Sequence, residues 1–511
     1  MDNNLFREKV LGCWTGKNIG GILGAPFEGI PDMLDLTFYD PVPACPLPND
    51  DLELQVMYAV ALSQMDTPYA GKKLFGKIWL EHMDFNCDEY AVALKNMRTG
   101  IMPPWSGKYD NYYIDGMGAA IRSELWACLA PGNPELAAKF AREDASVDHG
   151  GDGIEAEVFF AALESAAFEC SDLEQLIVTG LEFTRKDSRI YESIVDTCSL
   201  WRKFRDWKAV RNRIQEKYGS EFRTCVLPNI PFTVLALLAG GSDFGKTICT
   251  AVNCGMDTDC TGATSGAILG IIAPDSIPTE WKKPAGDALI VRETAIPGLK
   301  FPPTIDAFSD MVVSLSERIL HNVDDSDSAE PDYEKHLIRG EYAFIQNLQW
   351  YFVPTSGIEW KPFQCNAIYS SLNLPDYKYG KQLLLRFRFD IRDEGIYSVM
   401  FNTPSSCQVY LDSDYKHPFL HDSRDMLFGR MRIFSEMTEN RQFPASVRPV
   451  IFSPTLGGAP LNQIKRGLKL SAGTHELLAA IEPLDTEKEV YWGMGIGDNA
   501  SRFVLNAFRC V

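Results

Sequence analysis

The sequence predicts two domains of different classes: an all-α domain over residues 1–321 and an all-β sandwich over residues 333–511, joined by an acidic linker at 322–332. Through the first part, apolar residues recur at three- and four-residue spacing, as on helices that bury one face. From residue 333 onward, segments of period two are separated by turn residues, as in antiparallel sandwiches. The linker is rich in Asp and Ser, a composition typical of connections between domains.

The composition limits the class of protein and its partners. At 511 residues the chain is long enough for two or three domains, and its 45% hydrophobic content is that of a globular protein. The net charge of -20 argues against a nucleic-acid or anionic-membrane surface. The chain opens without a signal-sequence pattern and has no apolar run long enough to span a bilayer, and its 13 cysteines form no Cys-x-x-Cys pair. We therefore expect a cytoplasmic protein in a reducing compartment, and the oligomeric state stays open.

Two predicted helices carry glycine at every fourth position. Glycines four residues apart share one face of a helix, and each costs about 1 kcal/mol relative to alanine in a helix interior. Such a face indicates close approach to another backbone, with the other glycine-bearing helix as one candidate partner. The two sets are Gly12, Gly16, Gly20 and Gly24, followed much later by Gly262, Gly266 and Gly270.

Acidic residues stand near the ends of these helices. A turn with proline and glycine at residues 25–29 places Glu28 near the glycine-lined face, where spacing alone favours a solvated loop acid. Acids at helix starts act as caps or, where several oxygens gather, bind a hard cation such as Mg²⁺. Both interpretations stay open, although a cap explains one acid better than two. The residues concerned are Asn49, Asp50 and Asp51 at one helix start and Asp257 and Asp259 at another.

Two loops contain candidate ligand contacts. Residues 102–113 are dense in aromatic side chains, and Tyr109 with its neighbours either stacks on a flat ligand ring or forms the loop's own small core, which we favour. His149 lies in a second loop, beside acids and glycines at a helix start, although a lone histidine is more often structural. The backbone amides of Gly150 and Gly151 are candidate phosphate donors.

Further elements follow from the same patterns. Helices are expected at 116–129, from 134 to about 144, at 155–168 and, with short breaks, through 172–253. In the second part, residues 385–391 alternate between apolar and charged side chains, and a turn at 393–395 leads to a strand at 396–401. A hairpin is expected from strands at 468–470 and 476–481, with the turn at 471–474.

Four stretches together resemble the ADP-ribosylglycohydrolase family of the dinitrogenase-reductase-activating type. They are residues 12–28, 49–51, 119–154 and 253–270, so the resemblance covers roughly residues 5–275. It implies an all-α fold that binds one or two Mg²⁺ or Mn²⁺ ions and cleaves the bond between ribose C1 and a leaving group. The sandwich lies outside it, and a binding role and a structural or dimer-forming role are equally compatible with its sequence.

The resemblance also implies roles for individual residues. Asp50 and Asp51 match the first acidic pair of the family, and Asp257 and Asp259 match the second. Glu28 matches a loop glutamate implicated in catalysis. A metal-oriented water would then attack C1, with Glu28 accepting a proton from the water or from a ribose hydroxyl.

Other positions agree with the family less closely. His149 matches a histidine near the bound substrate. Asn49 stands where a threonine ligand is usual, and its amide oxygen suits the same cation. Cys260 replaces another threonine ligand, and a thiol is a poor partner for Mg²⁺, so a neighbouring threonine or water fills in or only one metal binds tightly. Met117 replaces a common Asn-Gly pair and leaves the substrate contacts open.

We therefore expect a metal-dependent hydrolase whose partner is an ADP-ribosyl or ribosyl small molecule or an ADP-ribosylated protein, with no nucleic acid and no membrane. One alternative is a non-catalytic ribosyl-ligand binder or structural protein that keeps the fold, which Cys260 and Met117 favour. Another is a hydrolase of a different nucleoside-like compound, which the added β domain favours.

Overall fold

The structure is a computed structural model of the chain. It describes residues 2–84, 88–98, 100–109, 111, 113–220, 222–293, 295–319, 323–327, 329–331, 338–345, 357–365, 369–372, 381–402, 407–412, 414, 420–421, 464–481, 490–498 and 508–510. The described residues form two compact units. The first, helical unit contains the described residues of 2–84 and 113–327, and the second contains the described residues of 88–111 and 329–510.

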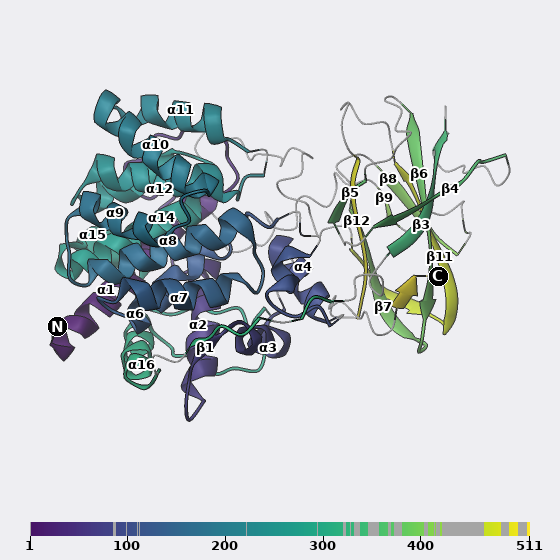
Figure 1. Ribbon diagram of the computed structural model, residues 1–511, viewed down its shortest axis with the longest axis horizontal. Helices are drawn as coiled ribbons and strands as arrows, with labels where there is room; N and C mark the ends of the chain where they lie inside the picture. The colour runs from purple at the N-terminus through teal and green to yellow at the C-terminus, as the bar shows by residue number, and fades with distance from the viewer. Residues whose placement is uncertain are drawn as a thin grey trace. The chain divides into compact units, whose positions relative to one another are not determined.

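The helical unit confirms the expected all-α character of the N-terminal part (Figure 1). Many of its helices begin at a side chain that accepts a hydrogen bond from a backbone N–H two or three residues later, as with Asp172, Ser188 and Asp243. Its elements are α1 Asn3–Gly24, η1 Ala25–Phe27, α2 Asp50–Ser63, β1 Ala70–Gly71, α3 Lys72–His82, η2 Ala120–Arg122, α6 Ser123–Leu129, α7 Pro134–Ala145, α8 Gly151–Ala167, α9 Leu173–Phe183, α10 Arg189–Phe204, α11 Trp207–Tyr218, α12 Val226–Gly240, α13 Phe244–Asn253, α14 Thr258–Ile272, η3 Pro274–Ser276, α15 Thr279–Ala285, α16 Ile305–Arg318 and β2 Val323–Asp324.

The two glycine-bearing helices, α1 and α14, pack against each other. The two helices are antiparallel. Gly12, near the start of α1, contacts Gly270, near the end of α14, whereas Gly24 contacts Thr258 at the start of α14. A Cβ atom at Gly16 would lie 2.0 Å from the carbonyl oxygen of Gly266. Only glycine therefore allows the two backbones to approach this closely, and the packing predicted from the spacing is confirmed.

The first residues of the predicted linker attach to the helical unit. Val323 and Asp324 form β2, which pairs in parallel with Ala70 and Gly71 of β1. Next to this pairing, the Lys72 ammonium donates to Glu143 at 3.1 Å and to the backbone carbonyl of Asp325 at 3.0 Å.

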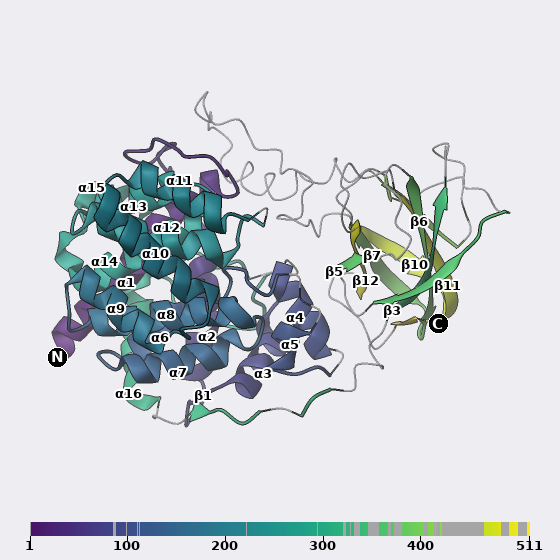
Figure 2. The same ribbon diagram turned by 45° about the horizontal axis from the view of Figure 1, so that its top comes forward.

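The second unit contains two antiparallel sheets, and Figure 2 shows several of their strands. The strand orders are β10-β7-β12-β5 and β4-β3-β6-β11-β8-β9, and β13 pairs with β6. From Leu385 to Ile391 the apolar side chains of β6 are buried and the charged side chains between them are more exposed, as the period of two predicted. Leu383 and Leu384 are also buried, so the alternation does not extend to the start of the strand. How the two sheets pack stays a prediction. The elements of this unit are α4 Asp88–Arg98, α5 Trp105–Lys108, β3 Ile338–Ile345, β4 Lys361–Cys365, β5 Tyr369–Leu372, β6 Gln382–Ile391, β7 Gly395–Asn402, β8 Cys407–Leu411, β9 Leu420–His421, β10 Ile464–Leu470, β11 Gly473–Ile481, β12 Val490–Asp498 and β13 Phe508–Cys510.

The hairpin expected around residues 471–474 is wrong. Both strands exist, but β10 pairs with β7 in one sheet, whereas β11 pairs with β6 and β8 in the other. The short connection after β6 likewise leads into the other sheet, so Gly395 pairs with Leu470 while Ile391 pairs with Gly473. Alternating burial reveals that a segment is a strand, but its hydrogen-bonding partner depends on the rest of the sheet.

Among the described residues, no helix has both the length and the apolar character that crossing a membrane requires.

Candidate metal centre and active site

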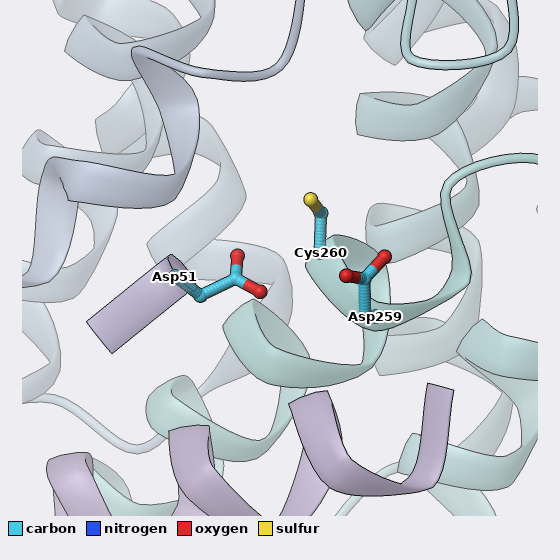
Figure 3. A group of neighbouring side chains, drawn as sticks. All are labelled: Asp51, Asp259 and Cys260. Carbon is cyan, nitrogen blue, oxygen red and sulfur yellow. The ribbon is translucent and has the colours of Figure 1, made fainter. Parts of the chain in front are cut away.

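The start of α14 and the start of α2 bring three metal-ligating side chains together. Asp51 comes from α2, and Asp259 and Cys260 come from α14 (Figure 3). Ligand atoms of the three side chains lie within 4.8 Å of one another, and all three residues are buried. The first acidic pair and the second, far apart in the sequence, therefore contribute to one cluster.

A second group of three overlaps the first. Ligand atoms of Glu28, Asp257 and Asp259 also lie within 4.8 Å of one another, with Glu28 half-buried and the two aspartates buried. Asp259 belongs to both groups. If the site holds two cations, Asp259 would be a ligand that the two groups have in common. We call the four carboxylates and Cys260 the acidic cluster: Glu28, Asp51, Asp257, Asp259 and Cys260.

Two backbone hydrogen bonds fix the Glu28 turn beside the loop that precedes α14. The Gly29 N–H donates to the Met256 carbonyl at 2.8 Å, and the Met256 N–H donates to the Ile30 carbonyl at 2.6 Å. Gly29 and Gly255 have φ values of 85° and 75°, in the left-handed region that favours glycine. The solvated loop position that spacing alone favoured for Glu28 is therefore replaced by a place in the cluster.

The side chains of Asp51 and Asp257 do not cap a helix. Asn49 is the N-cap of α2 and accepts from the Asp51 N–H at 2.9 Å, while Asp257 stands at the N-cap position of α14 without a side-chain cap hydrogen bond. Both carboxylates are buried, and their oxygens find no hydrogen-bond partner within the described part of the chain. A buried carboxylate without a donor is costly, and a bound cation removes that cost. The donor set of Asp51, Asp257 and Asp259 therefore fits a hard divalent cation such as Mg²⁺ or Mn²⁺, whereas the Cys260 thiol does not.

Burial and mutual repulsion disfavour ionisation within the cluster. Burial, with the Asp50 and Glu124 carboxylates adding repulsion, raises the pKa of Asp51 to about 7, although Lys17 acts in the opposite direction. Burial also raises the pKa of Asp257 and that of Asp259, with Glu28 as the next cause in both cases. A divalent cation would reverse these shifts, because it stabilises the ionised form of every ligand.

A buried lysine lies next to the Asp51 side of the cluster. Lys17 of α1 donates from its ammonium to Glu124 at 2.8 Å and lies 3.9 Å from Asp51. Burial alone would lower the pKa of Lys17, but Glu124 and Asp51 outweigh it and raise that pKa. Gln55 completes the arrangement by donating to Glu124 at 3.1 Å and to the Asp51 backbone carbonyl at 2.8 Å.

Asp50 belongs to neither group of three. Its side chain is partly exposed and lies 3.9 Å from the Arg292 guanidinium. Arg292 also donates from Nε to the buried Glu53 at 2.7 Å. This contact places Asp50 next to an ion pair that the sequence patterns do not reveal.

His149 and its loop are organised by a buried ion-pair network. The ring is fully buried, with Nδ1 2.9 Å from Asp148, and Arg122 donates to both Asp148 and Asp144. Burial would raise the pKa of Asp148, but Arg122 and His149 outweigh it and leave this pKa below its ordinary value. These contacts hold His149 in the loop before α8, and its contact with a substrate stays a prediction.

The two glycines that follow lie against residues 114 and 115. The Gly150 N–H donates to the Ile114 carbonyl at 3.4 Å, and a Cβ atom at Gly151 would lie 3.6 Å from the Asp115 carboxylate. An acidic side chain therefore already stands near the α8 N-terminus, where the sequence suggested a phosphate. Met117 is buried, with an exposed fraction of 1%.

Tyr109 lies in the second unit. There the Lys95 ammonium is 5.9 Å from the centre of the Tyr109 ring, and Asn96 donates to the Tyr109 backbone carbonyl at 2.8 Å. These contacts agree with an aromatic loop that packs on its own neighbours.

Sequence reasoning missed the charged residues that lie behind the cluster. Lys17 is a charged residue inside the apolar, glycine-bearing helix α1, and Glu124 lies in the apolar helix α6. A charge where helical periodicity predicts the core was the available signal, since buried charges are rarely left without a partner.

The N-terminal part of the chain matches a known family. A family model described as ADP-ribosylglycohydrolase matches residues 2–306. An uncharacterized protein from Archaeoglobus fulgidus is 26% identical over 307 residues, which cover 57% of this chain and 95% of that protein. A solved structure described as an ADP-ribosylglycohydrolase-related protein complex covers 62% of this chain and 100% of its own, with a TM-score of 0.44 and 20% identity. Because the family model spans more than half of the 511 residues and includes the whole acidic cluster, the chain belongs to the ADP-ribosylglycohydrolase family.

Proposed function

We propose that this protein is a metal-dependent hydrolase that cleaves the C1 glycosidic bond of an ADP-ribosyl or related ribosyl substrate. Membership of the family implies a glycohydrolase that acts on ADP-ribosyl compounds. The observation that carries the metal dependence is the convergence of Asp51, Asp257 and Asp259, which are buried and whose side chains meet at two helix starts.

In this proposal the cluster residues hold one or two Mg²⁺ or Mn²⁺ ions. Asp51, Asp257 and Asp259 are the principal ligands, with Glu28 beside them, and Asp50 lies at the partly exposed edge. Asn49 contributes mainly by capping α2 and so orienting Asp51. When bound, the cation supplies a Lewis acid that lowers the pKa of a water molecule and grips ribose hydroxyls.

The chain's own residues then complete the reaction. Glycoside hydrolysis passes through an oxocarbenium-like state, in which the bond from C1 to the leaving group breaks while the water oxygen bonds to C1. In this proposal Glu28 accepts the proton that the water loses, and the leaving group takes up a proton from solvent. Lys17 and Gln55 keep Asp51 in position during this step, because their contacts with Glu124 and the α2 backbone are buried.

The first experiment measures release of free ADP-ribose or ribose from a panel of ribosylated compounds, with and without Mg²⁺ or Mn²⁺. The panel includes ADP-ribosyl-arginine, ADP-ribosyl-serine and simpler ribosides, so a positive result also identifies the leaving group. Asp257→Asn should reduce turnover about 100-fold or more, since cation binding contributes several kcal/mol and each 1.36 kcal/mol is a factor of ten. Asp275→Asn is the matched control, because Asp275 is an exposed acid beyond the other end of α14.

The outcomes separate the competing functions. Metal-dependent release that Asp257→Asn lacks would support the hydrolase. Binding of ADP-ribose without release from any compound would favour a ribosyl-ligand binder. Equal activity in Asp257→Asn and the unmodified protein would refute the proposed use of the cluster.

A further inference from the structure

The two overlapping groups in the acidic cluster differ in their donor atoms. Glu28, Asp257 and Asp259 present only oxygen, whereas Asp51, Asp259 and Cys260 present two carboxylates and a sulfur (Figure 3). Mg²⁺ takes oxygen ligands almost exclusively. Thiolates instead favour softer divalent ions such as Zn²⁺, and borderline ions of this kind also accept carboxylates. The two halves of the cluster therefore differ in the cation that suits them.

Cys260 lies beside two buried carboxylates, those of Asp51 and Asp259. Asp51 is fully buried with both carboxylate oxygens unpartnered among the described residues, and one oxygen of the buried Asp259 is likewise unpartnered. Figure 3 shows these side chains extending toward the same space as Cys260, which is itself 8% exposed. Three buried residues with ligand atoms within 4.8 Å of one another, two of them with unpartnered carboxylate oxygens, are what a bound cation would leave when removed.

We infer that Asp51, Asp259 and Cys260 form a subsite for a thiophilic divalent cation of the Zn²⁺, Co²⁺ or Fe²⁺ class, beside an all-oxygen subsite for Mg²⁺ or Mn²⁺. The inference rests on the metal centre of the proposed function but assigns its two halves to different cations. On binding, the Cys260 thiol releases its proton to solvent and the sulfur forms the bond to the metal. Asp259 is the ligand that both subsites share.

Cobalt provides a direct test, because a thiolate bound to Co²⁺ gives a charge-transfer absorption that oxygen ligands do not give. The metal-free full-length protein is titrated with Co²⁺, then challenged with Zn²⁺ and separately with Mg²⁺. We expect the sulfur-to-cobalt band to appear, Zn²⁺ to abolish it and Mg²⁺ in large excess to leave it in place. Cys260→Ser should lose the band and weaken Zn²⁺ binding by more than the roughly 10–100-fold that loss of an outer-shell partner costs.

Two further variants show whether a lost band reflects the missing ligand or a folding defect in Cys260→Ser. Cys249→Ser removes another buried thiol, on α13, and should keep the band. Asp51→Asn leaves the sulfur in place and should weaken Co²⁺ binding at the same subsite. A wild-type protein without the band, a band that survives in Cys260→Ser, or a band that Mg²⁺ removes would each overturn the inference.

Failure of the inference and failure of the proposed function give different results. Metal-dependent release of ADP-ribose by the unmodified protein, without a cobalt–thiolate band, would keep the hydrolase and reject the subsite. A cobalt–thiolate band in a protein that releases nothing from any compound would keep the subsite and reject the hydrolase.

Discussion

At the scale of single residues, Lys17 determines how much uncompensated charge the acidic cluster contains. Its ammonium bonds to Glu124 at 2.8 Å and lies 3.9 Å from Asp51, and all three side chains are fully buried. Without Lys17, Glu124 would be an isolated buried charge, and the neutral Gln55 amide would be its remaining hydrogen-bond donor among the residues that the structure describes. The charges of Lys17 and Glu124 thus cancel each other, and most of the negative charge of Asp51 stays available to a cation.

Lys17→Met should destabilise the helical unit by about 3–5 kcal/mol, the typical cost of removing one partner of a buried ion pair. The double variant Lys17→Met with Glu124→Leu should lose much less, because no charge is then left unpaired. Urea unfolding followed by circular dichroism measures both. Equal losses in the single and double variants would show that packing of the lysine stem, not its charge, explains the effect.

His475 supplies a separate pH-dependent contact within the second unit. Its Nδ1 lies 2.7 Å from Asp412 and its Nε2 lies 2.9 Å from the Ser471 carbonyl, so both ring nitrogens face acceptors. Burial would lower the pKa of His475, but the Ser471 carbonyl and the Asp412 carboxylate outweigh it and raise that pKa. A doubly protonated ring satisfies both contacts.

The His475 contact should therefore stabilise this unit at acidic and neutral pH. Because the folded pKa exceeds the unfolded value of about 6.5, the contribution is complete below pH 6.5 and is lost as the pH rises through the folded pKa. An NMR titration of the ring should give a pKa above the ordinary value, and Asp412→Asn should lower it. His475→Gln assigns the signal, and an ordinary pKa that Asp412→Asn does not change would contradict the prediction.

At the scale of elements, the α1–α14 pair positions the acidic cluster. Contact between facing glycine carbonyls and α-carbons lets the helices approach without intervening side chains. The Thr258 hydroxyl then donates to the Gly24 carbonyl at 2.8 Å, so the end of α1 and the start of α14 meet where Glu28 and Asp257 are needed. A rigid helix pair thus determines the separation of the two loops that carry these acids.

Gly16→Ala should destabilise the protein by about 1–3 kcal/mol, the usual cost of overpacking. The same change in an open helix would stabilise it by about 1 kcal/mol, so the sign of the effect tests the close contact. Thr15→Ala is the control on the neighbouring position of α1, where the side chain is partly exposed, and should change stability by no more than about 0.5 kcal/mol. Thermal or urea unfolding of the full chain measures all three proteins, and a more stable Gly16→Ala would contradict the structure.

At the scale of the whole molecule, cation binding should stabilise only one of the two units. The acidic cluster lies wholly in the helical unit, and its buried carboxylates oppose one another until a cation is bound. At a free cation concentration of 100 Kd, the stabilisation would be about 2.7 kcal/mol.

Hydrogen exchange with and without Mg²⁺ measures this effect by segment. We expect slower amide exchange in α1, α2 and α14 when the cation is present, and unchanged exchange in β6 and β11. Removal of the cation with a chelator should reverse the protection, and Asp257→Asn should show little of it. Equal protection in the sheets would show that the two units are thermodynamically coupled.

Local patterns determined much of this molecule before any contact was known. Helical spacing predicted the N-terminal helices, period-two alternation predicted β6, and glycine at every fourth position predicted the close helix pair. These patterns show which side of a helix or strand is buried, and the residues of that element alone determine this. The two acidic motifs also indicated a cation site, because carboxylates in such numbers exceed what capping requires.

Only the tertiary structure decided which distant groups meet. It brought Glu28 and Cys260 to the acidic cluster, placed Lys17 behind Asp51 and left Asp50 beside Arg292. It also separated β10 from β11, which adjacency in the sequence had suggested as a hairpin. Such pairings depend on the packing of segments that are distant in the sequence, and the periodicity of one segment contains no information about the residue that it will face.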